Sequence, residues 1–379
     1  MALVLNEEQQ LLKESAKAFL TDKAPVAAIR KLRDERDETG YDRELWQAMA
    51  EMGFAGVLIE EEFGGSGFGF VGAGVIMEEM GRTLAASPML ATAILGVSAL
   101  NNVGTREQKS EILPKIANGE LTMALAVDEN PHHRPANTAL MVERESGDFV
   151  LNGRKTFVLD GHSADKLIVS ARTSGEAGDE TGITLFLLDR QADGISVERT
   201  VMVDSRNAAT INFESVRVGN AEVLGGVDEG FAVLQSVLDA GCICLAAEMS
   251  GLSQETFERT ITYLQERKQF GELIGTFQSL QHRAAHLFCE IENGKSVVLT
   301  ALQALDDGDE KASLLASLAK AKLGKVAKLA SNEGVQMHGG IGMTDEFEIG
   351  FFMKRARAAM ATFGDIGYHS DRFASLSGY

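Results

Sequence analysis

The stretch Arg267-Lys-Gln-Phe-Gly271, with the Phe277-Gln278 pair that follows it, decides how this sequence is interpreted. A second motif, Gln336-Met-His-Gly-Gly340, lies further downstream, and both motifs are set among segments with helical periodicity. An arginine side chain can hold a pyrophosphate through paired hydrogen bonds, and glycines let a ligand approach backbone amides closely. The two motifs therefore indicate a large phosphate-bearing ligand that lies between helices rather than on a nucleotide-binding sheet.

The composition limits the classes of function. The chain has 379 residues, of which 45% are hydrophobic and 24% charged, as in an ordinary globular protein. At roughly 100–200 residues per domain, we expect two or three packed units. The 36 basic and 55 acidic residues give a net charge of −19, which repels nucleic acid and anionic lipid. We therefore expect no nucleic-acid binding and no membrane insertion, and an anionic substrate would need a local basic patch.

The cysteines and the N-terminus favour a cytoplasmic protein. Cys242, Cys244 and Cys289 are an odd, sparse set without disulfide-framework spacing, which suits reduced thiols. The first ten residues have no basic region followed by an apolar run. We find no stretch of about 20 apolar residues, the length that a membrane-spanning helix needs.

Residues 1–120 predict a helical domain. Asn6 followed by Glu7 and Glu8 is typical of an N-cap with acidic residues in the first turn. Another helix is expected over residues 42–52, with Gly53 as its C-cap. The glycine-rich segment 61–69 lacks the Lys-Ser/Thr pair of a phosphate loop, so we interpret it as a connector.

Residues 121–222 predict a compact antiparallel β-domain. Asn152-Gly153 is a typical hairpin signal. Short β-rich runs with turn residues between them occur at 149–155, 166–171, 183–188 and 210–213.

Residues 223–379 predict a C-terminal four-helix bundle with one final helix, because long apolar stripes are separated by short loops. The whole fold is then α+β and mainly α: an N-terminal helical domain, a central antiparallel β-domain and a C-terminal bundle. The stripes that carry this prediction are Phe231, Leu234, Leu238, Leu245 and Met249; Leu280, Ala284, Leu287, Ile291, Val298 and Leu302; and Leu314, Leu315, Leu318, Ala321, Val326 and Leu329.

This order of domains resembles the acyl-CoA dehydrogenase family over essentially the whole chain. The segments 102–109 and 113–120, the Arg267 motif and the Gln336 motif carry the resemblance, with the family's spacing. The C-terminal segment 362–369 is more similar to the small subunits of heteromeric members, such as the small subunit of pimeloyl-CoA dehydrogenase.

The resemblance implies an enzyme that oxidises an acyl-CoA to the trans-2-enoyl-CoA, with FAD as hydride acceptor and an electron-transfer flavoprotein as the next acceptor. A carboxylate would take the α-proton, which becomes acidic enough only beside a polarised thioester carbonyl. The family shares the FAD site between subunits, which implies a homotetramer or an α2β2 heterotetramer with a paralogous subunit.

The resemblance also implies a set of FAD-binding residues. Arg267 and Gln278 stand where the family reaches the FAD of an adjacent subunit. Phe157 and Leu159 replace the ends of the family's Trp-Ile-Thr strand, so Phe157 keeps an aromatic wall and Leu159 offers only a backbone amide. At the place of the family's Thr-Glu-Pro-x-x-Gly-Ser loop, residues 127–134 of this chain have the sequence Val-Asp-Glu-Asn-Pro-His-His-Arg. The full expected set is Arg267, Gln269, Phe270, Phe277, Gln278, Gln336, His338, Gly339, Gly340, Phe157 and Leu159.

Neither family position for the catalytic base holds a glutamate. The C-terminal position reads Thr362-Phe-Gly-Asp365, and the position early in the bundle reads Leu238-Asp-Ala-Gly-Cys242. Asp365 lies next to the first, and Glu248 lies about two helical turns beyond the second on the same face. We keep both as candidate bases. The alternatives are an ion pair or cap for Glu248 and an N-cap of the last helix for Asp365.

Other polar groups have ordinary interpretations. His282, His286 and Cys289 share one helix face, but we see no fourth ligand for zinc and expect no metal site. The 132–134 loop, His-His-Arg, suits a solvated loop or a phosphate guide. The 354–357 cluster suits a solvated helix end, a CoA-phosphate contact or a subunit contact.

Three functions stay open at this point. The first is an FAD-dependent acyl-CoA dehydrogenase for a bulky or unusual acyl group, such as a dicarboxylic or steroid side-chain thioester. The second is a non-catalytic subunit that completes the FAD site of a paralogue. The third is a flavin monooxygenase on the same fold.

Overall fold

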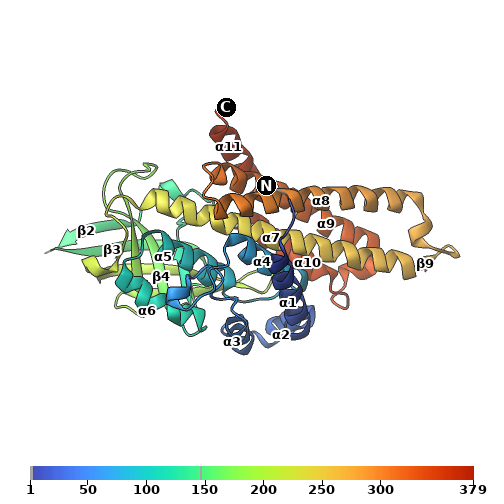
Figure 1. Ribbon diagram of the computed structural model, residues 1–379, viewed down its shortest axis with the longest axis horizontal. Helices are drawn as coiled ribbons and strands as arrows, with labels where there is room; N and C mark the ends of the chain where they lie inside the picture. Colours follow the sequence, from blue (N-terminus) through green and yellow to red (C-terminus); the bar gives the residue numbers. More distant parts are fainter. Residues whose placement is uncertain (1–2, 146) are drawn as a thin grey trace. The chain divides into compact units, whose positions relative to one another are not determined.

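The computed structural model describes residues 3–145 and 147–379 and is drawn in Figure 1. The chain divides into two compact units. Unit 1 contains the residues up to Glu35, Phe70–Ala86 and Cys242–Tyr379, and unit 2 contains Arg36–Gly69 and Ser87–Gly241.

Unit 1 is helical. Asn6 begins its first helix with the predicted cap: the Asn6 side chain accepts a hydrogen bond from Gln9 N, and the Gln9 side chain accepts one from Asn6 N. The helices of unit 1 are α1 (Glu7–Lys23), α2 (Val26–Glu35), α4 (Phe70–Thr83), α8 (Gln278–Asp306), α9 (Ala312–His338), α10 (Ile349–Ala361), α11 (Ile366–Leu376) and the part of α7 (Gly230–Glu266) from Cys242 onward.

Helix α9 is the centre of the C-terminal helices, because α8, α10 and α11 all pack against it. Small side chains dominate its buried face and allow close helix packing. One buried residue on this helix is a lysine, Lys320, which is 1% exposed. The small buried residues of α9 are Ala316, Ser317, Ala319, Ala321, Gly324, Ala327, Ala330, Ser331 and Gly334.

Helix α7 is long and apolar enough to cross a membrane, which the sequence reading missed. In the part of the chain that the structure describes it is the one helix of this kind, and 72% of its most apolar window is buried inside the protein. Such burial is typical of the core helix of a globular protein.

Unit 2 begins with short helices. The predicted helix over 42–52 is α3 (Arg43–Glu51): the Asp42 carboxylate accepts hydrogen bonds from Glu44 N and Leu45 N. Its chain leaves through Gly53 at φ +80. The segment 61–69 is a short 3-10 turn followed by a loop, as expected of a connector. The other helices are a π-helix (Met89–Gly96), α5 (Val97–Val103) and α6 (Arg106–Ala117).

The β-strands of unit 2 form one sheet in the order β6-β7-β3-β2-β4-β5-β8, with β1 paired to β4. The sheet is mixed rather than wholly antiparallel, because β1 and β2 each pair with β4 in parallel. Strand β1 comes directly after helix α6 and is not joined to β4 by a hairpin turn, so the two strands can run parallel. The strands are β1 (Met123–Ala126), β2 (Met141–Glu145), β3 (Asp148–Leu159), β4 (Lys166–Arg172), β5 (Ile183–Asp189), β6 (Ile195–Val201), β7 (Asn207–Val218) and β8 (Val223–Leu224).

The Asn152-Gly153 hairpin prediction was wrong. Both residues lie inside β3, at a register shift against β7. Asn152 Oδ1 accepts a hydrogen bond from Ser215 N, and Gly153 has φ +148 with Leu140 packed against it. The same residue chemistry that favours a tight turn here makes a β-bulge.

Candidate functional site

The Arg267 motif forms a hairpin at the end of the α7 and α8 helices, where Figure 1 shows β9. Strands β9 (Lys268–Gln269) and β10 (Glu272–Leu273) are joined by Phe270 at φ 54 and Gly271 at φ 84. Two left-handed residues in succession make the hairpin turn that matches the twist of paired strands. Its tip points into solvent, since Phe270 is 93% exposed.

The Gln336 motif forms the end of α9. The helix stops at Gly339, whose φ of 63 and ψ of −140 only glycine adopts readily. Gly340 differs in its backbone: its φ is not left-handed and a Cβ atom there would meet nothing within 4 Å, so neither conformation nor the chain's own packing requires a glycine. The bare main chain at Gly340 is thus available to a group from outside the chain.

His338 supports this turn from within. The side chain is 3% exposed, its Nδ1 lies 2.6 Å from Gly334 O, and its ring stacks on Tyr263 with 4.5 Å between centroids. Burial lowers its pKa. The ring therefore packs the ends of α7 and α9 together.

An apolar cluster brings the two motifs together. Ile274 and Met337 are buried in it, and Phe277 packs against it. Around the cluster, the guanidinium of Arg267 and the carboxamides of Gln269, Gln278 and Gln336 are exposed. Guanidinium, carboxamide and open main chain are the groups that hold a pyrophosphate-bearing dinucleotide, so this part of the chain fits FAD.

Phe157 and Leu159 belong to unit 2 and lie at a second bulge of β3, between Lys155 and Val158. Phe157 has φ 56, and its side chain is 59% exposed while Val158 is buried. Leu159 is half-buried and pairs with Ala208. The bulge turns the Phe157 ring outward, where it is available for stacking.

Sequence reasoning missed the ion pair that holds the neighbouring 127–138 loop. Lys155 Nζ is completely buried and donates to Val127 O at 2.8 Å and to Glu129 Oε1 at 2.7 Å. Burial lowers the pKa of Lys155. Glu129 also accepts from Leu140 N, so both ends of the loop are tied to one carboxylate. The only signal in the sequence was a lysine in the strand at an inward position.

The 127–138 loop borders a cavity of 350 Å³, and His132 and Arg134 are part of its lining. His133 is held within the loop, since its Nδ1 lies 2.8 Å from Asp128 Oδ2. The lining also contains Asp128 and Glu129, so its charge is mixed, and a phosphate-guiding role for the 132–134 loop stays a prediction.

The two candidate bases have very different surroundings. Glu248 on α7 is 0% exposed and accepts two hydrogen bonds from Arg355 of α10, at 2.7 and 2.7 Å. Asp365 is exposed and caps α11, since its Oδ1 accepts from Tyr368 N at 2.8 Å. Both alternative roles that the sequence offered are present, and the role of either residue as a base stays a prediction.

No cluster of three or more His, Cys, Asp or Glu side chains within residues 3–145 and 147–379 is arranged to hold a metal ion. Cys242 and Cys244 are buried free thiols, and Cys289 is an exposed one. In the 354–357 cluster, Arg357 bonds to Asn332 Oδ1 at 3.0 Å.

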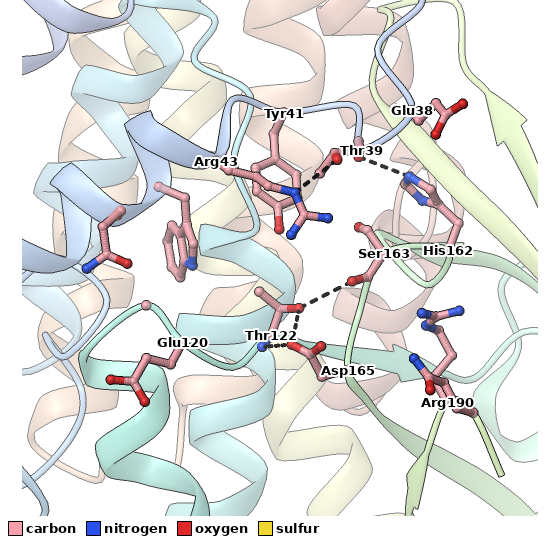
Figure 2. Close-up of a pocket in the computed structure, with 14 residues that line it drawn as sticks. Glu38, Thr39, Tyr41, Arg43, Glu120, Thr122, His162, Ser163, Asp165 and Arg190 are labelled. Carbon is pink, nitrogen blue, oxygen red and sulfur yellow. Dashed lines mark hydrogen bonds between the residues drawn. The ribbon is translucent and has the colours of Figure 1, made fainter.

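A second cavity, of 570 Å³, lies between α3 and the turns of the sheet within unit 2 (Figure 2). Figure 2 shows Tyr41 and Arg43 on one side and Ser163 and Asp165 on the other. Two buried nitrogens of lining residues, Trp46 Nε1 and His162 Nδ1, have no hydrogen-bond partner among the described residues. Nothing in the lining identifies an occupant.

Three family models match the chain in succession. They are the N-terminal domain of acyl-CoA dehydrogenase at residues 6–120, its middle domain at 132–216 and its C-terminal domain at 228–375. A relative, the 3-(aryl)acrylate reductase of Clostridium sporogenes, is 31% identical over 355 residues, which is 92% of each chain.

Solved structures agree with this assignment. The butyryl-CoA dehydrogenase of Megasphaera elsdenii has a TM-score of 0.91 at 25% identity, with 100% of both chains covered. A variant of the steroid ACAD Tcur3481-Tcur3483 has a TM-score of 0.88 at 29% identity, with 98% of both chains covered. Proteins of this kind are FAD-binding oxidoreductases, and the helical, β and helical order of the fold confirms the architecture predicted from the sequence. This chain belongs to the acyl-CoA dehydrogenase family.

Proposed function

We propose that this chain is an acyl-CoA dehydrogenase that converts an acyl-CoA thioester to its trans-2-enoyl-CoA. The observation that carries the proposal is the surface where the Arg267 hairpin and the Gln336 turn meet over one apolar cluster. When bound, FAD supplies the acceptor for the β-hydride. We place its pyrophosphate beside Arg267, with Gln278 and Gln336 as neutral hydrogen-bond partners.

Main chain and aromatic groups complete the proposed FAD site. Gly339 and Gly340 let the dinucleotide approach the end of α9, and the exposed hairpin tip with Phe270 suits a contact with a neighbouring subunit. We therefore propose a homotetramer, with the site shared between protomers. By the family resemblance, Phe157 of unit 2 would offer an aromatic wall and Leu159 a backbone donor to the flavin.

Asp365 is the base we propose for the α-proton. Its Oδ1 is occupied by the cap to Tyr368 N, and Oδ2 is the atom that would take the proton. Glu248 is the second candidate, because protonating it would give up a buried, charge-assisted pair with Arg355.

The names of the relatives support a proposal for the class of substrate, but not for one particular acyl-CoA. The relatives act, by name, on short-chain, aryl and steroid compounds, so we propose a catabolic acyl-CoA substrate with a bulky or unusual acyl group. We propose an electron-transfer flavoprotein as acceptor and the cytoplasm as location, the latter supported by three free cysteines. The domains are taken as 1–120, 121–222 and 223–379.

A heteromeric assembly is the alternative that one observation favours. No glutamate occupies either family position for the base, so a paralogous subunit would supply it in an α2β2 heterotetramer. The resemblance of segment 362–369 to small subunits supports the same alternative.

The deciding experiment is anaerobic bleaching of the flavin absorbance of FAD-reconstituted protein. The panel contains butyryl-CoA, isovaleryl-CoA, 3-phenylpropanoyl-CoA and a steroid side-chain CoA ester. Bleaching by the homomeric protein supports the dehydrogenase and excludes the dependent subunit. Bleaching only after co-expression with a paralogue supports the heteromer. Oxygen-dependent product formation with supplied reduced flavin would instead indicate a monooxygenase.

A further inference from the structure

The turn between α10 and α11, residues 362–365, is held by hydrogen bonds from buried side chains. Lys320 on α9 donates from Nζ to Met360 O at 3.1 Å and to Gly364 O at 2.9 Å. His369 on α11, 1% exposed, donates from Nε2 to Phe363 O at 2.9 Å. Three acceptors around one turn are thus met by the buried side chains of Lys320 and His369, and Cys242 Sγ also lies 3.9 Å from Phe363 O.

These carbonyl oxygens need partners because α10 ends at Ala361 and α11 starts at Ile366. The last carbonyls of a helix have no donor left within it, and a cation near them is favourable. The turn also carries a conformational cost at Phe363, which is left-handed at φ 56, whereas Gly364 adopts its φ of 99 readily. The conformation therefore depends on what holds it.

A neutral donor would satisfy two carbonyls at lower desolvation cost than a buried ammonium. The presence of a lysine at this position, 1% exposed, is the feature that needs an explanation. The charged and titratable groups that act on it are Cys242 of α7, Arg355 of α10 and Asp365 of the turn, and His369 of α11 bonds to the same turn. Cys242 and Asp365 favour its charge, and Arg355 opposes it.

We propose that Lys320 is the positioning residue of the reaction site: its ammonium group, with His369, fixes the α10–α11 turn and thereby the placement of Asp365. This inference rests on the proposed function, because it takes the turn to be part of the reaction site. Lys320 donates to main-chain carbonyls at this turn and acts through them.

The charge of Lys320 then matters to the rate in the alkaline range. Burial lowers its pKa from 10.5 to about 8, so the folded protein loses this proton before the unfolded chain does. Between these two values the unfolded chain binds more protons, and the contribution of Lys320 to folding becomes more favourable as pH rises. The grip on the turn weakens over the same range. A fall in kcat above pH 8 without a fall in stability is the signature of the positioning role.

The test uses FAD-loaded, assembled protein as wild type, Lys320→Met, Lys320→Arg and the control Lys325→Met, which changes an exposed lysine of the same helix. The readouts are hydrogen exchange of the 362–365 amides, and kcat and KM between pH 6 and 10. For Lys320→Met we expect exchange about tenfold faster, and a kcat about ten- to a hundredfold lower with KM little changed. Lys320→Arg keeps the positive charge at all pH values tested. We therefore expect this variant to retain kcat and to lose the fall in kcat above pH 8, the alkaline limb of the pH profile.

The outcomes separate the two proposals. Wild-type protein that no acyl-CoA bleaches defeats the proposed function. Active wild type with unchanged exchange and unchanged kcat in Lys320→Met overturns the positioning role. Should Lys320→Met fail to fold, His369→Phe removes the second donor to the turn, and the same two readouts decide. An alkaline limb that persists in Lys320→Arg also overturns the role of the Lys320 charge.

Discussion

The β9–β10 hairpin and the α10–α11 turn use the same two residues in the same conformation. Phe270-Gly271 has φ values of 54 and 84, and Phe363-Gly364 has φ values of 56 and 99. Both pairs connect helices of unit 1, yet Phe270 is 93% exposed whereas Gly364 is buried and its carbonyl accepts from Lys320. The same Phe-Gly pair therefore gives the same left-handed φ values in both turns, and the surrounding structure determines whether the turn is exposed or held by buried side chains.

Because of this difference in burial, the hairpin can contact molecules outside the protomer, whereas the α10–α11 turn contacts side chains inside it. The hairpin holds itself through its own main chain, as in the 2.8 Å bond from Ile274 N to Arg267 O, and presents side chains outward. The α10–α11 turn directs its carbonyls toward interior donors. We interpret the first as a surface for a cofactor and a neighbouring subunit, and the second as a rigid part of the protomer.

The largest expected effect is on the interior side, at the pair of Glu248 and Arg355. Glu248→Gln removes the carboxylate that pairs with the buried Arg355 guanidinium, and we expect this to cost about 3–5 kcal/mol of unfolding free energy. Urea unfolding of the purified protein measures the loss. The control is Glu145→Gln, whose partner Arg217 is 67% exposed, with an expected change of about 0–1 kcal/mol.

This variant also tests whether Glu248 is the base. A folded Glu248→Gln protein that keeps its flavin bleaching excludes Glu248 from proton transfer. Stability equal to that of wild type would contradict the view that the ion pair anchors α10 to α7.

The next effect compares the two glycines directly. Gly364→Ala forces alanine into a left-handed conformation and places its Cβ 2.3 Å from the Tyr368 ring, so we expect a loss of about 2 kcal/mol or more. Gly271→Ala meets nothing within 4 Å and carries only the conformational cost of about 1 kcal/mol. Thermal unfolding of both variants measures the difference. Equal losses would mean that the interior contacts add nothing to the turn.

The sequence predicts the hairpin better than the turn for a physical reason. Arg267, Gly271 and Gln278 lie close together in the chain, so their pattern is visible without a structure. Likewise Asn6 and Asp42 indicate the starts of their helices, because a cap acts within three residues.

Long-range partners are the part that sequence reasoning missed. Lys320 lies on a different helix from the carbonyls it meets, and Glu248 lies on α7 while its partner Arg355 lies on α10. The apolar stripe expected for this helix includes Ala321 but not Lys320, and periodicity does not say which oxygens face the lysine. The hairpin prediction at Asn152-Gly153 was wrong for a related reason. Both a tight turn and a β-bulge favour a glycine, and only the pairing of β3 with β7 shows that a bulge forms here.

A smaller effect separates the two roles of Asp365. Asp365→Asn keeps a good N-cap for α11 and removes the ionisable group, whereas Asp365→Ala loses both. We expect Asp365→Ala to lose about 1 kcal/mol of stability and Asp365→Asn to stay near wild type. If Asp365 is the base, both variants lose flavin bleaching by acyl-CoA. Bleaching that survives in Asp365→Asn assigns the residue to the cap alone and turns attention to a partner subunit.

The smallest effect on stability belongs to Gly340, on the outward side of the comparison. A methyl group there meets nothing within 4 Å and the φ angle is not left-handed, so Gly340→Ala should change stability by no more than about 0.5 kcal/mol. Its FAD affinity, measured by titrating apoprotein with FAD, should nevertheless fall, because the methyl group would occupy space that we propose for the dinucleotide. Gly350→Ala, at an equally open glycine within α10, is the control and should bind FAD normally. An unchanged affinity in Gly340→Ala would remove the end of α9 from the FAD site, and the open glycine would then have no explanation in either the chain or its cofactor.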